Sequence, residues 1–246
     1  MQISKSKLNL YSSLKSSKLR KKNKLFYVEG EKSVKDTISH FKIEAIIYLE
    51  GKHFDFIPAG VVAYNVTQGV LNKLSSLVNP PDIIAIYRYP ENEASIPEKL
   101  EEEYYIVLDG IQDPGNLGTI IRTCHWFGIK QIFASKDTVD IYNPKTIQST
   151  MGSISKVKVT YCNLEDLFQR HPSLQVYGLL LDGENIFEAS LEKKGFILFG
   201  NEGKGISGEI RKYVTEKLLI PPGSEDHSES LNVGVAVGIT IAQFLK

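Results

Sequence analysis

Three short segments in the second half of the chain are rich in glycine, asparagine, proline and charged side chains. They span 109–118, 200–207 and 220–233, and the first runs into a stretch that carries Arg122. Glycines let a backbone approach a ligand closely, and helix N-termini offer unpaired N–H donors. Taken singly, each segment is equally typical of a tight turn followed by a helix cap. Together they predict a ligand site built largely from loop backbone.

Apolar strands and helices alternate around these segments, which is the pattern that must position them. The predicted strands are 105–108, 131–134, 157–161, 176–181, 196–199 and 217–220. The predicted helices are 119–127, 144–151, 164–170, 206–213 and a last one from 231. Such alternation indicates an α/β fold with a parallel sheet covered on both faces. Ligands of these sheets bind at the carboxyl ends of strands, where the three segments lie.

The first ninety or so residues show a smaller α/β pattern of their own. Its predicted strands are 25–28, 43–49 and 83–89, and its predicted helices are 29–40 and 67–74. Prolines and an acidic run, Glu101 to Glu103, follow and are typical of a linker. We therefore predict an N-terminal domain over 1–92, a linker over 93–103 and a C-terminal domain over 104–246.

Segment 1–24 carries eight basic residues and no acidic residue. Leucines interleaved with the charges predict a helix that packs on one side and presents lysines on the other. A solvated terminal helix is the alternative, and the charges alone do not decide between them. The candidate contacts to a polyanion are Lys18, Arg20, Lys21, Lys22 and Lys24.

Bulk properties exclude several classes of protein. Lys plus Arg and Asp plus Glu are equal at 29 each, so net charge neither demands nor excludes a polyanionic partner. Cys124 and Cys162 lack the paired spacing of a zinc site or a disulfide framework, which predicts no metal and two reduced thiols in a cytoplasmic protein. The apolar stretch 231–245 is too short for a bilayer and the N-terminus is polar, so we expect no membrane segment and no signal peptide.

Taken in order, the three segments resemble the motifs of the SpoU family of RNA 2′-O-ribose methyltransferases, the TrmH-type branch of the SPOUT superfamily. Residues 116–122 match the first motif, Asn-x-Gly-x-x-x-Arg. Residues 200–206 resemble the second, and 220–221 with 230–233 resemble the third. Residues 20–30 are similar to the opening of the family's ribosomal-protein-like module.

This resemblance implies a C-terminal domain with a deep trefoil knot, a homodimer, and S-adenosylmethionine as cofactor. It implies methylation of a ribose 2′-hydroxyl in structured RNA, with ribosomal RNA preferred over transfer RNA. A knotted RNA-binding protein without catalysis is the main alternative. An oxidoreductase on a doubly wound sheet would need Gly-x-Gly-x-x-Gly after the first strand of the C-terminal half, and the sequence lacks it there.

The resemblance also implies roles for single residues. The expected cofactor-binding residues are Leu180, Leu181, Gly200, Asn201, Gly205, Ile220 and Leu231. Arg122 is expected to bind the phosphate and to stabilise the developing alkoxide, because a guanidinium is a poor general base. Proton removal by an RNA phosphate oxygen or by Arg122 itself stays open. Glu202 is either a rival base or a loop brace. Asn116 would orient the loop or the ribose, and Asn232 would position substrate and hold the knotted loop.

Ser230 is expected either to position substrate or to cap the final helix. The sequence also departs from the family pattern at three places. Gly234 replaces a common serine, Gln148 stands where an arginine is common, and residues 224–229 make the third segment longer and more acidic. These departures weaken a predicted phosphate contact at residue 148 and leave the third segment's geometry open.

Overall fold

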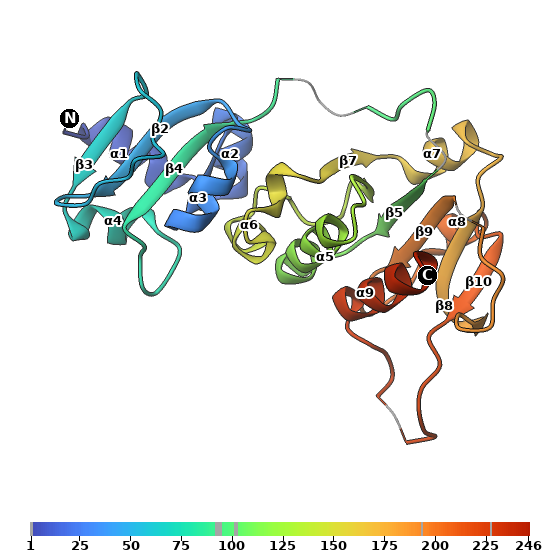
Figure 1. Ribbon diagram of the computed structural model, residues 1–246. Helices are drawn as coiled ribbons and strands as arrows, with labels where there is room; N and C mark the ends of the chain where they lie inside the picture. The colour runs from blue at the N-terminus through green and yellow to red at the C-terminus, as the bar shows by residue number, and fades with distance from the viewer. Residues whose placement is uncertain (1, 92–94, 101–102, 193, 227) are drawn as a thin grey trace. The chain divides into compact units, whose positions relative to one another are not determined.

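The computed structural model describes residues 2–91, 95–100, 103–192, 194–226 and 228–246 (Figure 1). Contacts divide the chain into two compact units. The first contains the residues up to 92 together with 140–155, and the second contains 93–139 and 156–246. Residues 140–155 therefore pack in the first unit, whereas the sequence analysis counted them with the C-terminal domain. We describe each unit by itself.

The first unit is built on a four-stranded sheet with the order β1-β4-β2-β3. Its strands are β1 (Leu25–Glu29), β2 (Ile43–Leu49), β3 (Ala63–Val66) and β4 (Ile83–Arg88). Its helices are α1 (Lys5–Ser13), α2 (Ser17–Asn23), α3 (Glu31–Thr37), α4 (Gln68–Leu74), α6 (Pro144–Thr150) and the 3-10 turn η1 (Ser153–Ser155). β4 is antiparallel to both β1 and β2, and β3 is parallel to β2. Tyr11 and Leu14 lie in the core of this sheet, so the N-terminal segment is part of the fold.

The second unit is a six-stranded, fully parallel sheet with the order β10-β8-β9-β5-β6-β7. Its strands are β5 (Tyr104–Asp109), β6 (Gln131–Ser135), β7 (Lys158–Cys162), β8 (Val176–Asn185), β9 (Gly195–Gly200) and β10 (Glu216–Leu219). Its helices are α5 (Pro114–Trp126), α7 (Leu164–Arg170), α8 (Gly208–Arg211) and α9 (Val233–Phe244). The expected α/β fold with a parallel sheet is confirmed. The knotted path of the C-terminal segment stays a prediction.

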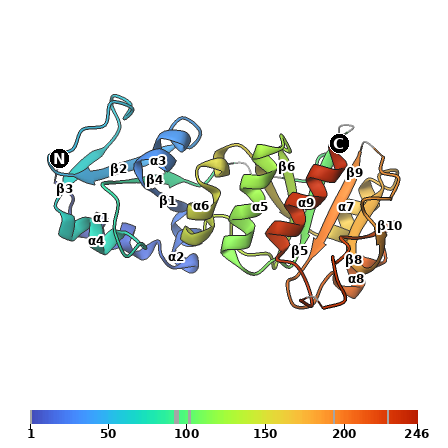
Figure 2. The same cartoon turned by 60° about the horizontal axis from the view of Figure 1, so that its bottom comes forward.

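Helices cover both faces of this sheet. α5 and α9 pack side by side on one face (Figure 2). α7 and α8 pack together on the other, over a core that includes Phe133, Phe168 and Phe196. Because side chains alternate between the faces of a strand, the central strands β5, β6 and β9 contribute to both cores and are nearly continuous apolar runs.

Several elements differ from the expectation. The basic segment forms two helices rather than one, with a break between Ser13 and Ser17. Strand β3 was not predicted. α5 begins at Pro114 instead of Thr119, because Asp113 caps the helix and a proline suits its first position.

Within the residues that the structure describes, no helix is both long and apolar enough to cross a bilayer. Nor do the described residues contain three His, Cys, Asp or Glu side chains grouped so as to hold a metal ion.

Candidate active site

The candidate site lies where β5 and β9 end side by side. The last pair of their register joins Asp109 to Gly200. In the sheet, β6 and β7 lie beyond β5 toward one edge, and β8 and β10 lie beyond β9 toward the other edge. In parallel α/β sheets ligands bind at such a point, because loops diverge there from neighbouring carboxyl ends.

The loop after β9 is a tight turn closed on itself. The main-chain N–H groups of Asn201 and Gly205 each donate to the other residue's carbonyl oxygen at 2.9 Å. Gly205 has a φ of 70°, which favours glycine, and a Cβ on Gly200 would lie 2.1 Å from Gly205. The main-chain N–H groups of Asn201 and Gly205, two of the expected cofactor-binding residues, are thus already used within the turn.

The turn is fastened to the loop after β5. The Asn201 side chain donates through Nδ2 to the Gly110 carbonyl at 2.7 Å, and its Oδ1 accepts the N–H groups of Gly203 and Lys204. The Asp109 carboxylate accepts the Ser207 N–H at 2.7 Å. The two loops therefore form one framework.

A third loop supports the same framework from β6. Ser135 Oγ accepts the Gly110 N–H at 2.8 Å, and Gly110 adopts a φ of 73°. Gln112 donates its side-chain N–H to the Asp137 carbonyl at 2.8 Å. Gln112 belongs to the predicted first segment but was given no role, and Ser135 was not predicted to belong to the site. The position of Ser135, a polar residue directly after the predicted strand 131–134, was the signal that could have found it.

A chain of three polar side chains joins all three predicted motif loops. Asn116 Nδ2 donates to Glu202 Oε1 at 3.0 Å, and Asn232 Nδ2 donates to Asn116 Oδ1 at 2.9 Å. The second oxygen of Glu202 accepts the main-chain N–H of Gln112 at 3.4 Å. Both carboxylate oxygens are thus engaged, as expected of a residue that braces the loops.

Asn232 also begins the final helix. Its Oδ1 accepts the N–H groups of Gly234 and Val235, so it is the N-cap of α9. The alternative that Ser230 caps this helix is wrong, because the cap is Asn232, two residues later, and the helix itself starts at Val233. Ser230 is exposed in the loop before the cap.

Arg122 lies on α5, six residues after Asn116. It is exposed, and it makes no hydrogen bond or ion pair with any residue that the structure describes. Successive helical residues turn by about 100°, so Arg122 and Asn116 point in different directions from the helix axis. The structure therefore brings Asn116, Glu202 and Asn232 together and leaves the guanidinium outside their hydrogen-bond chain.

The expected apolar cofactor residues occur in the middle of β8, just after β10 and before α9. Residues 179–183 bulge between Gly178 and Glu184, which both pair with β10. Leu181 in this bulge is 75% exposed and Leu231 is 48% exposed, while Leu180 and Ile220 are half-buried. Large apolar side chains left open to solvent beside a polar site suit a flat aromatic ligand.

Of the five basic residues expected to contact RNA, four are exposed and one is buried. Lys18, Lys21 and Lys22 on α2 and Lys24 after it are exposed. Arg20 is only 1% exposed, and its NH2 group binds Asp140 at 2.8 Å. Its side chain is buried inside the first unit, so the expectation that it contacts RNA does not fit the structure.

The structure shows what surrounds Gly234 and Gln148, two residues that depart from the family pattern. A Cβ on Gly234 would lie 3.1 Å from the Thr119 methyl group and 3.2 Å from Asn232 Oδ1, so α5 and α9 meet closely where serine is common. Gln148 lies on α6 in the first unit, where it lines a pocket beside Glu29. The long third segment, 224–226 with 228–229, is exposed where the structure describes it.

Neither cysteine is a candidate nucleophile. Both are unpaired and buried. Burial raises the pKa of the Cys124 thiol well above its usual range and that of Cys162 to about 11. Thiolate character is therefore suppressed at neutral pH.

Comparison with known families matches both parts of the chain. Residues 103–242 match the model of the SpoU rRNA methylase family, and residues 5–85 match the MRM3-like substrate binding domain. The first match alone spans more than half of the chain.

Named relatives agree with these matches. The 23S rRNA (guanosine(2553)-2'-O)-methyltransferase of Bacillus subtilis is 28% identical, over 96% of this chain and 94% of its own. A Porphyromonas gingivalis structure assigned to the TrmH family of RNA methyltransferases is 30% identical, with a TM-score of 0.87 over 99% of this chain and 98% of its own. An AdoMet-bound rRNA methyltransferase of Sinorhizobium meliloti is 25% identical, with a TM-score of 0.87 over 99% and 97%.

Proposed function

This chain belongs to the SpoU rRNA methylase family, and on that basis we propose that its substrate is a ribosomal RNA. It is an S-adenosylmethionine-dependent RNA 2′-O-ribose methyltransferase. The match to relatives named as rRNA methyltransferases supports the choice of RNA. The chain of hydrogen bonds from Glu202 through Asn116 to Asn232, which holds three loops at one edge of the sheet, supports the placement of the site. A cytoplasmic location is part of the same proposal.

The apolar residues expected at the cofactor site fit the adenine ring of S-adenosylmethionine in polarity. The exposed side chains of Leu181 and Leu231 offer apolar surface that an adenine ring would cover. When bound, this cofactor supplies an electrophilic methyl group on a sulfonium sulfur. Asn201 and Gly205 hold the neighbouring turn rigid, so their contribution is the shape of the loop rather than N–H donors.

We assign Arg122 to the phosphate that adjoins the target ribose. Its unengaged guanidinium can bind two phosphate oxygens and stabilise the ribose oxygen as that oxygen loses its proton. Correct alignment of the reacting atoms alone is worth many powers of ten in rate. Because both carboxylate oxygens of Glu202 already accept hydrogen bonds, we assign Glu202 to bracing the loops. We assign acceptance of the ribose hydroxyl proton to a phosphate oxygen of the RNA.

Transfer of a labelled methyl group tests the activity and the role of Arg122. Wild type should label ribosomal RNA, and Arg122→Ala should lose at least about 100-fold in rate while cofactor affinity stays unchanged. Arg170→Ala, which removes an exposed arginine from α7, is the matched control. Cofactor uptake without labelling of any RNA would instead support the inactive RNA-binding alternative.

The identity of the RNA needs a separate experiment. Ribose methylation is mapped in cells that contain or lack the protein. Loss of one methylated ribosomal nucleotide in cells lacking the protein would support the proposal, and loss of a transfer RNA methylation would overturn the choice of substrate.

We propose that the first unit binds the RNA through α2. The lysines at 18, 21 and 22 displace counterions from phosphates, so their replacement by glutamine should lower affinity and reduce the salt slope by up to about 3. Deleting residues 1–24 would be a poor test, because Tyr11 and Leu14 belong to the core. An unchanged slope would show that α2 is only a solvated helix.

We also propose a homodimer formed through α5 and α9. Trp126 is 85% exposed and Val235 is 50% exposed, on helices that already pack together. Exposed aromatic side chains of this size are typical of interfaces. Light scattering should give twice the mass of one chain, and Trp126→Glu should shift it to one. A monomeric wild type would contradict this proposal.

A further inference from the structure

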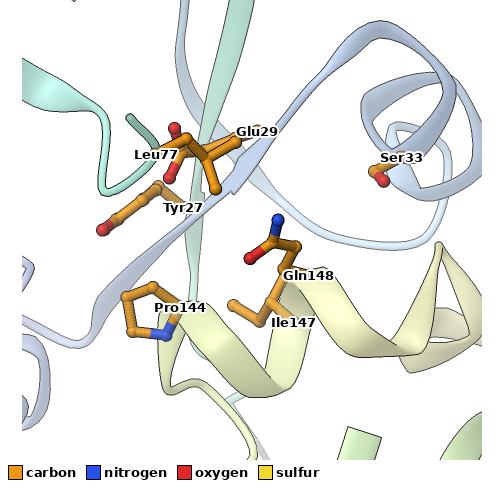
Figure 3. Close-up of a pocket in the computed structure, with 7 residues that line it drawn as sticks. All are labelled: Tyr27, Glu29, Ser33, Leu77, Pro144, Ile147 and Gln148. Atoms are coloured by element: carbon orange, nitrogen blue, oxygen red, sulfur yellow. The ribbon is translucent and has the colours of Figure 1, made fainter. Parts of the chain in front are cut away.

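The unit that carries the basic helix α2 is completed by residues from far along the chain. After β6 the chain enters the first unit at Asp140 and leaves it after Ser155. α6 packs on β1 and η1 packs on α3. Figure 3 shows Pro144, Ile147 and Gln148 of α6 facing Tyr27 and Glu29 of β1 across a pocket of about 20 Å³. A space of that size suits a water molecule rather than a ligand, so the segment is closely packed.

Arg20 is the point where this segment meets α2. Its NH1 group donates to the carbonyls of Leu14 and Lys15 at 3.0 Å each, just after the end of α1. Its NH2 group donates to Asp140 Oδ2 at 2.8 Å. One buried guanidinium thus ties the end of α1, the middle of α2 and residue 140 together.

Further contacts fix Asp140 itself. Its second carboxylate oxygen accepts the Tyr142 N–H at 2.9 Å. The Tyr142 ring packs against Phe26 of β1 and against Tyr89, with centroid distances of 4.4 and 4.3 Å. The carboxylate that binds Arg20 is therefore held in place by residues that pack on the sheet.

We propose that Asp140 is a positioning residue for RNA binding, which orients the lysine face of α2 through the buried Arg20 without touching RNA. This rests on the proposed function of the first unit. Lys18, Lys21 and Lys22 flank Arg20 on α2 and are exposed, so the position of Arg20 sets theirs. A buried guanidinium that loses its carboxylate is costly to keep, and α2 must then shift to reach water.

The substitution Asp140→Asn separates this idea from simple electrostatics, because the two predict opposite signs. Removing a negative charge from an RNA-binding unit should tighten binding if charge alone matters. If Asp140 positions α2, binding should weaken by about tenfold, and the salt slope should fall because the lysines lose their phosphates.

Asp82→Asn is the matched control. It makes the same change of charge in the same unit, in an exposed ion pair with Lys52, and it should leave affinity unchanged or slightly higher. Asp140→Glu keeps the charge and should recover most of the affinity. Arg20→Gln should weaken binding as Asp140→Asn does, and the double variant should be no weaker than either single one, because both changes break one interaction.

Dissociation constants for ribosomal RNA are measured at several salt concentrations, together with cofactor affinity as a check on the second unit. Weaker RNA binding with a lower slope, unchanged cofactor affinity and recovery by Asp140→Glu would support the proposal. Equal or tighter binding by Asp140→Asn would overturn it, as would failure of Asp140→Glu to recover affinity. If Asp140→Asn does not fold, Arg20→Gln is compared with Lys52→Gln, which removes the same charge from the exposed pair with Asp82. Arg20→Gln should weaken RNA binding clearly more than Lys52→Gln, and equal effects would overturn the proposal. Absence of RNA binding by wild type would instead remove the proposed function.

Discussion

Gly200 is the position at which one added methyl group should damage the site most. An ideal Cβ there lies 2.1 Å from the carbonyl carbon of Gly205, within the turn that the mutual bonds of Asn201 and Gly205 close. An ordinary contact begins at 3.4 Å, so in Gly200→Ala the turn must move by about 1.3 Å or open. The atom in the way is main chain, so no side-chain rotation relieves the contact.

The expected effect is large on activity and moderate on stability. Overpacking of this kind costs about 1–3 kcal/mol of unfolding free energy. A misplacement of about 1 Å near a reaction can lower the rate about 100-fold, which corresponds to about 2.7 kcal/mol of activation free energy. Glu202 lies in the displaced turn, so its hydrogen bond to Asn116 should break as well.

Gly203→Ala is the matched control in the same turn. A Cβ there would meet nothing closer than Asn201 Oδ1 at 3.8 Å, and this residue has no positive φ. Methyl transfer, cofactor affinity and thermal unfolding are compared for wild type and both variants. Transfer by Gly200→Ala within about threefold of Gly203→Ala would refute the steric reasoning.

Three further predictions concern other residues. Asn232→Asp should keep the cap of α9 and its stability but lose methyl transfer, because a carboxylate cannot donate to Asn116; Asn232→Ala should lose transfer and about 1 kcal/mol of stability. Equal unfolding temperatures for the two would contradict the capping role. Burial raises the pKa of Glu29 above its ordinary value of 4.5, so its stabilising contribution is present below about pH 4.5 and is lost as the pH rises through the folded pKa. Glu29→Gln should therefore raise the unfolding temperature more at pH 7 than at pH 4, and an equal rise at both would disprove this. Gly234→Ser should destabilise by about 1 kcal/mol, and adding Thr119→Ser should restore stability, since it removes the methyl group 3.1 Å away; denaturant unfolding that shows no recovery would exclude the contact with Thr119.

The predicted strands of the second unit and the meeting of the three loops follow from local patterns. Runs such as 105–108 and 196–199 are apolar and are followed by Gly, Asn or Asp, so strand ends are marked in the sequence. Parallel strands bring their carboxyl ends to one edge, and the pairing of Asp109 with Gly200 follows from that geometry. The partners within the edge, such as Ser135 and Gln112, depend on side-chain reach that spacing does not encode.

Other features needed information that no local pattern holds. The start of α5 at Pro114 was obscured by Gly115, Asn116 and Gly118, which are poor helix formers, although Asp113 followed by proline is a start signal. The apolar Ile147 indicates that helix 144–151 is buried, but not in which unit. Arg20 lies in a run of exposed lysines, and arginine is almost never fully buried unless paired, so its burial required knowledge of Asp140.

The first unit is built from two separate stretches of the chain, and this has a consequence for folding during synthesis. About fifty residues separate the end of β4 at Arg88 from Asp140, and β5, α5 and β6 are made in between. Until the later segment emerges, the guanidinium of Arg20 has no counterion and the aromatic slot beside Phe26 has no Tyr142 to fill it. The nascent chain therefore cannot finish its domains in order. A chain that stops before residue 140 would keep this gap open and expose apolar surface to chaperones and proteases.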